Sequence, residues 1–195
     1  MIKAVVFDCF GVLVRDGWLP FCDKHFGNNT ELREQARANN RRVDMGLSTY
    51  NNYIHENAKL AGISEDQARE EIESNPPNDE LFAIIRDQLK PQYKIGLLSN
   101  AGANWLDDLF GKEQVALFDE IALSYEMRAT KPDPVAYETI ATRLGVLPEE
   151  CVFVDDQERF CVGAEAVGMK SIYYQSNEQL IGELKKHNII IRSLK

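Results

Sequence analysis

The chain has 195 residues, enough for one substantial hydrophobic core with a smaller insert. A net charge of −9 argues against nucleic acid as a partner, because binding it depends on basic patches that neutralise phosphates. No apolar run approaches the roughly 20 residues of a membrane span, and the sequence shows no signal peptide. With 44% hydrophobic and 27% charged residues and four scattered cysteines, we expect a soluble, cytoplasmic protein with reduced thiols and no membrane partner.

Five short apolar segments are expected to form buried strands. They lie at residues 2–7, 93–99, 120–124, 151–155 and 170–174. Their hydrophobicity is continuous rather than alternating, which is typical of parallel strands covered on both faces. Helical patterns separate them, so the sequence predicts an α/β fold with a doubly wound, Rossmann-like parallel sheet of five core strands.

One stretch, residues 15–87, interrupts this alternation. It contains polar helical segments such as "TELREQARANN" and "SEDQAREEIE", and no convincing strand. The "SNPPND" at 74–79 is typical of a loop that returns to the main body. We therefore predict a small helical cap over 15–87, inserted after the first strand, and a catalytic core made of 1–14 and 88–195.

Polar side chains gather where the expected strands end, and one lysine follows the third strand. These residues are Asp8, Ser99, Asn100, Lys131, Asp155 and Asp156. Ligands of open parallel sheets bind outside the carboxyl ends of the strands. Each residue alone could be a turn, cap or surface residue, but their joint placement at strand ends favours a single site.

The chemistry of such a site follows from its charge. Converging carboxylates repel one another and any anionic substrate, so they need a cation. Oxygen ligands with open positions suit Mg²⁺, which binds through one or two carboxylates together with substrate phosphate. A carboxylate beside such a phosphate can act as nucleophile and form an acyl phosphate. Ser99, Asn100 and Lys131 are then the candidate substrate-binding residues, with the Ser99 hydroxyl donating to a phosphoryl oxygen.

Four segments resemble the motifs of the haloacid dehalogenase superfamily of hydrolases, in the family's order: "VVFDCFGVL", "IGLLSNA", "KPDPVAY" and "VFVDDQERFCVGAEAVGM". The helical insert is similar to the cap of many members.

The resemblance implies that Asp8 is the nucleophile, Ser99 the phosphate-binding hydroxyl and Lys131 the charge-neutralising base. It also implies that Asp155 binds Mg²⁺ together with the Asp8 side chain and the Phe10 carbonyl, with Asp156 supporting them directly or through water.

Three positions depart from the family pattern. Phosphatases of the family usually carry a second Asp, the general acid, where this chain has Phe10. Phe160 stands where Asn is frequent, and Arg128 where small residues such as Gly are common. Arg15 and Trp18 follow the first motif near the expected site mouth, where either a substrate-facing or a hinge role fits.

Three functions follow from these features. The first is a Mg²⁺-dependent phosphatase that acts on a small phosphorylated metabolite through an aspartyl phosphate, because a small cap excludes bulky ligands. The second is a 2-haloacid dehalogenase-like hydrolase, since those enzymes have an aromatic residue in place of the second Asp. The third is a catalytically impaired protein that binds a phosphorylated ligand. The acidic pair in "VFVDD" favours the first.

Overall fold

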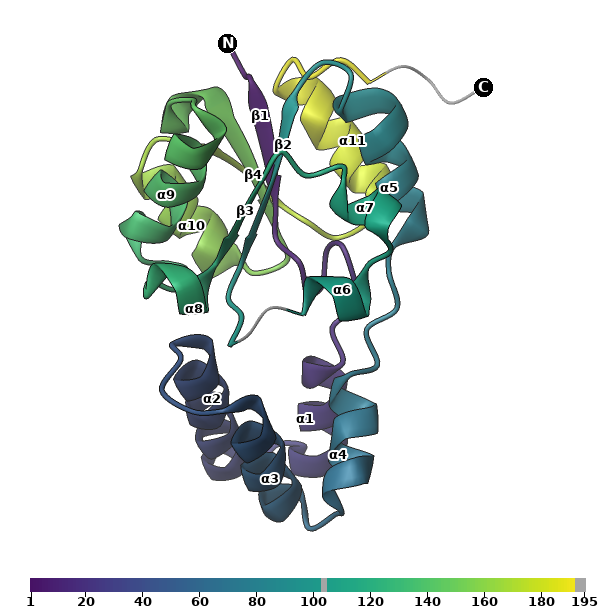
Figure 1. Cartoon of the computed structure of the whole chain (residues 1–195), viewed down its shortest axis with the longest axis vertical. Coiled ribbons are helices and arrows are strands. Elements are labelled where there is room, and N and C mark those ends of the chain that lie inside the picture. The colour runs from purple at the N-terminus through teal and green to yellow at the C-terminus, as the bar shows by residue number, and fades with distance from the viewer. Residues whose placement is uncertain (103–104, 192–195) are drawn as a thin grey trace.

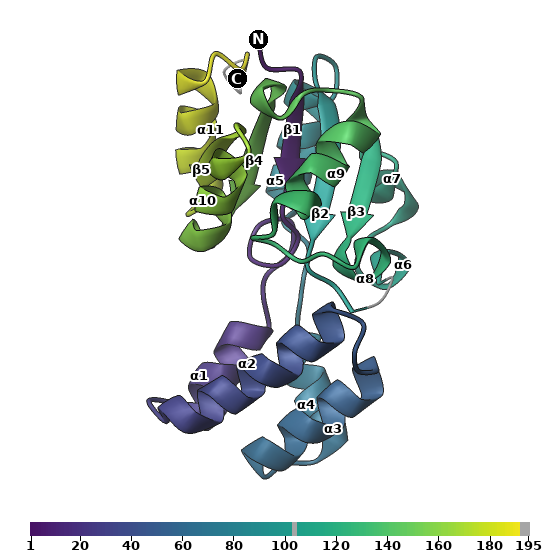
Figure 2. The ribbon, with the colours of Figure 1, turned by 90° about the vertical axis from the view of Figure 1, so that its left-hand side faces the viewer.

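A five-stranded parallel sheet forms the centre of the protein, in a computed structural model that describes residues 1–102 and 105–191. Its strand order is β3-β2-β1-β4-β5 (Figures 1 and 2). The strands are β1 (Ala4–Phe7), β2 (Lys94–Ser99), β3 (Glu120–Leu123), β4 (Cys151–Asp155) and β5 (Lys170–Tyr173). The predicted α/β fold and its five strands are confirmed.

Helices cover both faces of the sheet, which explains why its strands are mostly apolar, with polar residues chiefly at their ends. One face packs against α9 (Pro134–Leu144) and α10 (Glu158–Ala166). The other packs against α5 (Asp79–Ile84), which continues into the π-helical turn η1 (Ile85–Leu89), and against α11 (Asn177–Lys186). The shorter elements are α6 (Leu106–Leu109), α7 (Lys112–Val115), α8 (Ser124–Met127) and the 3₁₀ turn η2 (Pro148–Glu150). No helix in the described ranges is long and apolar enough to cross a membrane.

Four helices between β1 and α5 pack on one another around a core of their own, which contains Phe21, Tyr53 and Ile54. They are α1 (Trp18–Phe26), α2 (Thr30–Asp44), α3 (Tyr50–Ala61) and α4 (Glu65–Ile72). We call this bundle the cap. It lies beyond the carboxyl ends of the strands and joins the sheet-containing core through two connecting segments (Figures 1 and 2).

The cap is shorter than the predicted range of 15–87, because α5 and the start of η1, which fall inside that range, belong to the core. Leu81, Phe82 and Ile85 are buried in the same cluster as the sheet residues, so the boundary lies near residue 78 rather than 87. The two connecting segments run side by side: the Arg15 N–H donates to the Pro76 carbonyl at 3.0 Å, and the Asn78 N–H donates to the Leu13 carbonyl at 2.8 Å.

Candidate active site

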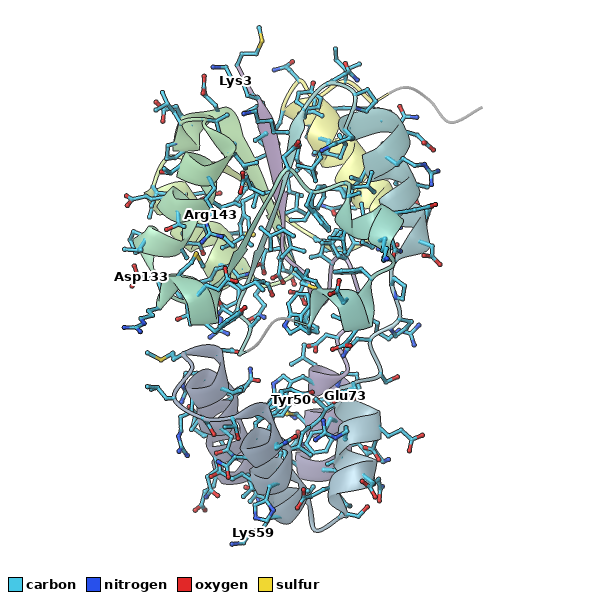
Figure 3. All side chains as sticks on the ribbon, viewed as in Figure 1. Lys3, Tyr50, Lys59, Glu73, Asp133 and Arg143 are labelled. Atoms are coloured by element: carbon cyan, nitrogen blue, oxygen red, sulfur yellow. The ribbon has the colours of Figure 1, made fainter. Side chains whose placement is uncertain are left out.

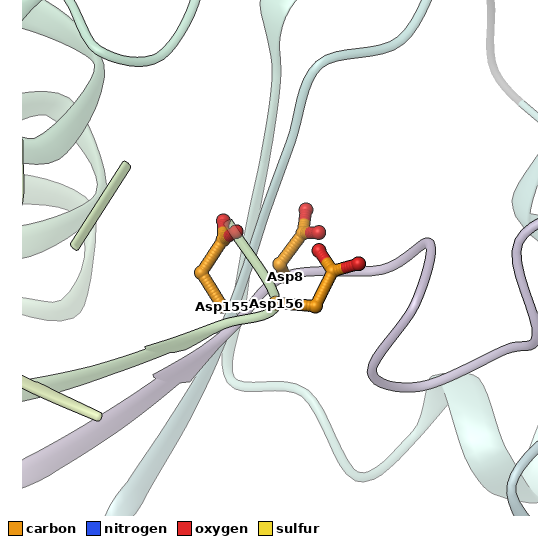
Figure 4. Close-up of side chains that lie close together, drawn as sticks. All are labelled: Asp8, Asp155 and Asp156. Carbon is orange, nitrogen blue, oxygen red and sulfur yellow. The ribbon is translucent and has the colours of Figure 1, made fainter. Parts of the chain in front are cut away.

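The change of strand direction brings two aspartates together. The chain builds the sheet outward from β1 on one side and then returns to add β4 on the other, so the crevice between β1 and β4 is the expected ligand site. Asp8 directly follows β1 and its N–H donates to the Val154 carbonyl at 2.9 Å, while Asp155 is the last residue of β4. Ligand oxygens of Asp8, Asp155 and Asp156 lie within 4.8 Å of one another (Figure 4).

Lys131 lies between two of these carboxylates. Its Nζ donates to Asp8 Oδ1 at 2.5 Å and to Asp155 Oδ2 at 2.6 Å, and its side chain is 1% exposed. The Phe153 and Phe160 rings flank the ammonium, with centroids 5.2 and 4.8 Å from Nζ. The departure at Phe160 therefore gives the lysine an aromatic neighbour.

Asn100 holds the Lys131 segment in place. The Lys131 N–H donates to Asn100 Oδ1 at 2.8 Å, and Asn100 Nδ2 donates to the Lys131 carbonyl at 3.2 Å. Both polar atoms of this predicted substrate-binding side chain are thus hydrogen-bonded to the Lys131 backbone. Ser99, the last residue of β2, is 1% exposed, and within residues 1–102 and 105–191 its hydroxyl donates in one long contact of 3.4 Å, to the Asn100 carbonyl. The Ser99 hydroxyl can therefore rotate to donate to a ligand and lose only a weak hydrogen bond.

Burial dominates the electrostatics of the carboxylates. It raises the pKa of Asp8 well above its usual value, with the Lys131 charge opposing and the neighbouring carboxylates adding to the shift. Burial and then the charge of Asp155 raise the pKa of Asp156 to about 7. Burial alone would lower the pKa of Lys131, but the charges of Asp155 and Asp8 together raise it. If all three carboxylates were ionised around the one ammonium, they would leave an excess of two negative charges, and the raised pKa values show that this excess is unfavourable without a further cation.

The residues fit a divalent cation. Asp156 Oδ1 is buried and accepts no hydrogen bond from the described residues, which is unfavourable unless another partner satisfies it. Gly11 lets the loop after Asp8 run against this carboxylate: its φ is +88°, and a Cβ would lie 2.2 Å from Asp156 Oδ2. An oxygen donor set with two surplus negative charges suits Mg²⁺ better than a soft metal.

A cavity of about 620 Å³ extends from Asp8 and Lys131 to the cap. Its core side includes Asp8, Phe10, Ser99 and Lys131. Its cap side is built by residues of the first connecting segment, of helices α1 to α4 and of the position directly after α4: Asp16, Trp18, Asn40, Asp44, Tyr50, Tyr53, Arg69 and Glu73. Among the residues with open roles, Trp18 lines this cavity, whereas Arg15 and Arg128 do not.

Arg128 has a local explanation. It ends α8 in the left-handed region, with φ of +55°, and its N–H donates to the Ser124 carbonyl at 2.8 Å. Glycine adopts this conformation without strain, which accounts for small residues being common there.

Sequence reasoning missed the acidic residue Asp44, because nothing in a polar helix shows which face meets the core. Asp44 is the last residue of α2, and its carbonyl accepts the Ser124 hydroxyl at 2.6 Å. Gly102 allows the same close approach, since a Cβ there would lie 2.6 Å from the Val43 carbonyl. Burial raises the pKa of Asp44 to about 7, with the Lys131 charge opposing.

We expect Asp44→Asn to stabilise the protein much more at about pH 8 than at about pH 4, where the effect on stability should be small. A folded-state pKa of about 7, above that of an unfolded aspartate, means that folding favours the protonated form. The stability contributed by the protonated carboxyl is fully present only below the pKa of an unfolded aspartate, about 4, and is lost progressively as the pH rises to about 7. Asparagine stays neutral throughout. Thermal midpoints of both proteins at the two pH values check this; equal differences would contradict the raised pKa.

Fold and site define a class of hydrolase, and the family comparison identifies it: residues 2–168 match the model of haloacid dehalogenase-like hydrolases. The chain belongs to this family.

Two relatives carry phosphatase names. The first is YhcW of Bacillus subtilis (strain 168), which is named as a provisional phosphatase. It is 26% identical to this chain over 117 residues, which are 58% of this chain and 52% of that protein. Phosphatase MT3486 of Mycobacterium tuberculosis (strain CDC 1551 / Oshkosh) is 42% identical over 55 residues, 28% of this chain. The chain thus matches about half of the first relative and 25% of the second.

Solved structures show the same fold. An enzyme of the family from Bacteroides thetaiotaomicron, BT-2542, superposes with a TM-score of 0.71 and 24% identity, over 94% of this chain and 98% of that one. The same enzyme has been solved with magnesium and inorganic phosphate. The L-2-haloacid dehalogenase of Xanthobacter autotrophicus, with chloropropionic acid covalently bound, has a TM-score of 0.66 and 23% identity, over 98% of this chain and 85% of that one.

Proposed function

We propose that the protein is a Mg²⁺-dependent phosphatase that acts on a small phosphate monoester through an aspartyl phosphate on Asp8. The observation that carries this proposal is the cluster of Asp8, Asp155 and half-buried Asp156, in which the Lys131 ammonium pairs with the first two. Asp8 and Lys131 also line the cavity. The two surplus negative charges of the fully ionised cluster call for a divalent cation, and that cation with Lys131 attracts a phosphate.

The proposed roles follow from the positions of the residues. Asp8, Asp155, Asp156 and the Phe10 carbonyl would hold Mg²⁺, which when bound neutralises phosphate charge. The free Asp8 oxygen forms a bond to phosphorus as the ester P–O bond breaks, while Ser99 donates to a phosphoryl oxygen. The leaving alcohol takes its proton from water, because Phe10 has none to give. Attack of a second water on phosphorus then releases phosphate and restores Asp8.

A dehalogenase-like reaction is the second candidate, and Phe10 is the observation that favours it. Displacing a halide needs no proton, so an aromatic residue beside the nucleophile is chemically suitable. The ring of Phe10 packs against that of Trp105, with ring centroids 5.1 Å apart, and both residues line the cavity. Against this candidate stands the acidic pair of Asp155 and Asp156, which a halide-displacing site does not need. A binding protein without turnover is the third candidate.

A screen of phosphate release over phosphorylated metabolites, with Mg²⁺ and with EDTA, tests the proposal. We expect release that requires Mg²⁺. Halide release from 2-chloropropionate without metal would instead establish the dehalogenase reaction. Inactivity in both assays, together with thermal stabilisation by a phosphorylated ligand, would favour a binding protein.

Phe10→Asp should raise the hydrolysis of alkyl phosphates by at least about tenfold, since general acid catalysis typically contributes about 10²–10⁴-fold. Hydrolysis of 4-nitrophenyl phosphate should change less, because its leaving group needs no protonation. Phe10→Leu is the matched control, because it also removes the ring contact with Trp105 but supplies no acid. Comparison of kcat on butyl and 4-nitrophenyl phosphate measures the effect. No gain in a folded Phe10→Asp protein would show that the acid comes from elsewhere.

A further inference from the structure

The cavity has aromatic residues on both of its sides. On the cap side, the ring centroids of Trp18 and Tyr50 each lie 5.6 Å from the ring centroid of Tyr53. On the core side, the ring centroids of Trp105 and Phe10 lie 5.1 Å apart, and the two rings pack edge-on. All five residues line the cavity, and all but Tyr53 are only half-buried. Figure 3 places Tyr50 at the end of the cap that faces the core.

This aromatic lining begins beside the proposed nucleophile. Phe10 is two residues from Asp8, and its partner Trp105 stands in the segment that follows the phosphate-binding candidate Ser99. A phosphate at Asp8 and Ser99 would therefore have its ester group among these rings. A volume of about 620 Å³ leaves room for a ring between the core and the cap.

The charged residues of the cavity restrict the chemistry of the ester group that can bind there. Asp16, Asp44, Glu73 and Asp108 line it in addition to the proposed metal site. The two arginines of the lining are already engaged. Arg69 donates to Glu73 Oε1 and Asn51 Oδ1, each at 2.9 Å, and Arg159 donates to Gln157 Oε1 at 2.8 Å and lies over the Phe160 ring. A second anionic group on the substrate would thus meet four further carboxyl groups, of which burial already disfavours the ionisation of Asp16 and Asp44, and two arginines that already have hydrogen-bond partners.

We infer that the substrate is a monophosphate whose alcohol carries an aromatic ring and no second anionic group. The inference rests on the proposed phosphatase activity, which it narrows to a substrate class. Rings prefer edge-on and offset contacts with other rings, and such contacts add to the burial of apolar area. A neutral or cationic ring system satisfies both the aromatic lining and its acidic surroundings. A second phosphate or carboxylate satisfies neither.

The test compares alkyl monophosphates whose leaving groups are chemically alike, so that the missing proton donor affects all equally. We expect kcat/KM for 2-phenylethyl phosphate to exceed that for butyl phosphate by about tenfold, the effect of one or two ring contacts. A carboxylate added to the phenyl ring should remove this advantage. Trp105→Leu should bring the ratio of the two rates close to one. Tyr173→Leu, at an exposed tyrosine outside the cavity, should preserve the ratio.

Tryptophan fluorescence provides a second readout, because the chain has two tryptophans and both Trp18 and Trp105 line the cavity. In Asp8→Asn with Mg²⁺, 2-phenylethyl phosphate should change the emission at lower concentration than butyl phosphate does. Equal kcat/KM values for the two esters would overturn the inference and leave the phosphatase proposal standing. Absence of hydrolysis of both esters and of 4-nitrophenyl phosphate would overturn the phosphatase proposal, and equal titration midpoints in fluorescence would then overturn the inference as well.

Discussion

Asp8→Asn is expected to lower phosphate release by more than about 10³-fold, because the amide cannot form the acyl phosphate on which the proposed reaction depends. The fold should persist. Burial disfavours the charge of Asp8, so a neutral side chain of the same shape removes a repulsive carboxylate while Lys131 keeps Asp155 as its partner. Initial rates with 4-nitrophenyl phosphate and Mg²⁺, alongside thermal unfolding, measure both effects.

Two comparisons make this prediction specific. Asp66→Asn, at an exposed position in the first turn of α4, should keep the wild-type rate. Beryllofluoride, which mimics a phosphoryl group on an aspartate, should raise the thermal midpoint of the wild type in the presence of Mg²⁺ and leave that of Asp8→Asn unchanged. Substantial activity in Asp8→Asn would show that another residue is the nucleophile.

Lys131→Met should abolish activity and also destabilise the protein, by about 3–5 kcal/mol in EDTA. The lysine is almost fully buried between two carboxylates, so its removal leaves both without their hydrogen-bonded cation. An approaching phosphate would meet three carboxylates and no ammonium. Chemical denaturation in EDTA measures the loss of stability, and Mg²⁺ should restore part of it.

The control for this variant is Lys24→Met. Lys24 forms an ion pair with Glu71 at a similar distance, 2.7 Å, but its side chain is 59% exposed. Exposed pairs contribute less than about 1 kcal/mol, so this variant should be nearly as stable as the wild type. If Lys131→Met destabilised the protein no more than Lys24→Met does, the buried cluster would not be held together as described.

The residues at the strand ends could be predicted because a strand's carboxyl end fixes where the next side chain lies. Asp8 and Asp155 needed only the strand pattern and the rule for open parallel sheets. The cap side of the cavity could not be predicted in this way. Asp44 and Tyr50 lie on polar helices, and their orientation depends on contacts such as that between Ser124 and the Asp44 carbonyl, 80 residues apart.

The position of α5 shows the same limit. Its apolar residues, Leu81 and Phe82 among them, indicate a helix with a buried face, but not whether the cap or the sheet covers that face. Asn100 is a second example. Its place at a strand end predicts contact with substrate, and Asn100 lines the cavity. Its amide is also hydrogen-bonded to the Lys131 backbone, a partner that only the folded chain reveals.

The central claim is that Asp8 carries the phosphoryl group during turnover, and trapping that group tests it most directly. The wild type is mixed with 4-nitrophenyl phosphate and Mg²⁺, quenched in acid, and its peptides are mapped by mass spectrometry. Because Phe10 cannot activate the attacking water, the intermediate should accumulate. We expect a phosphoryl group on Asp8 that hydroxylamine removes and that does not form in EDTA. Phosphate release with Asp8 unmodified at every quench time would contradict the mechanism.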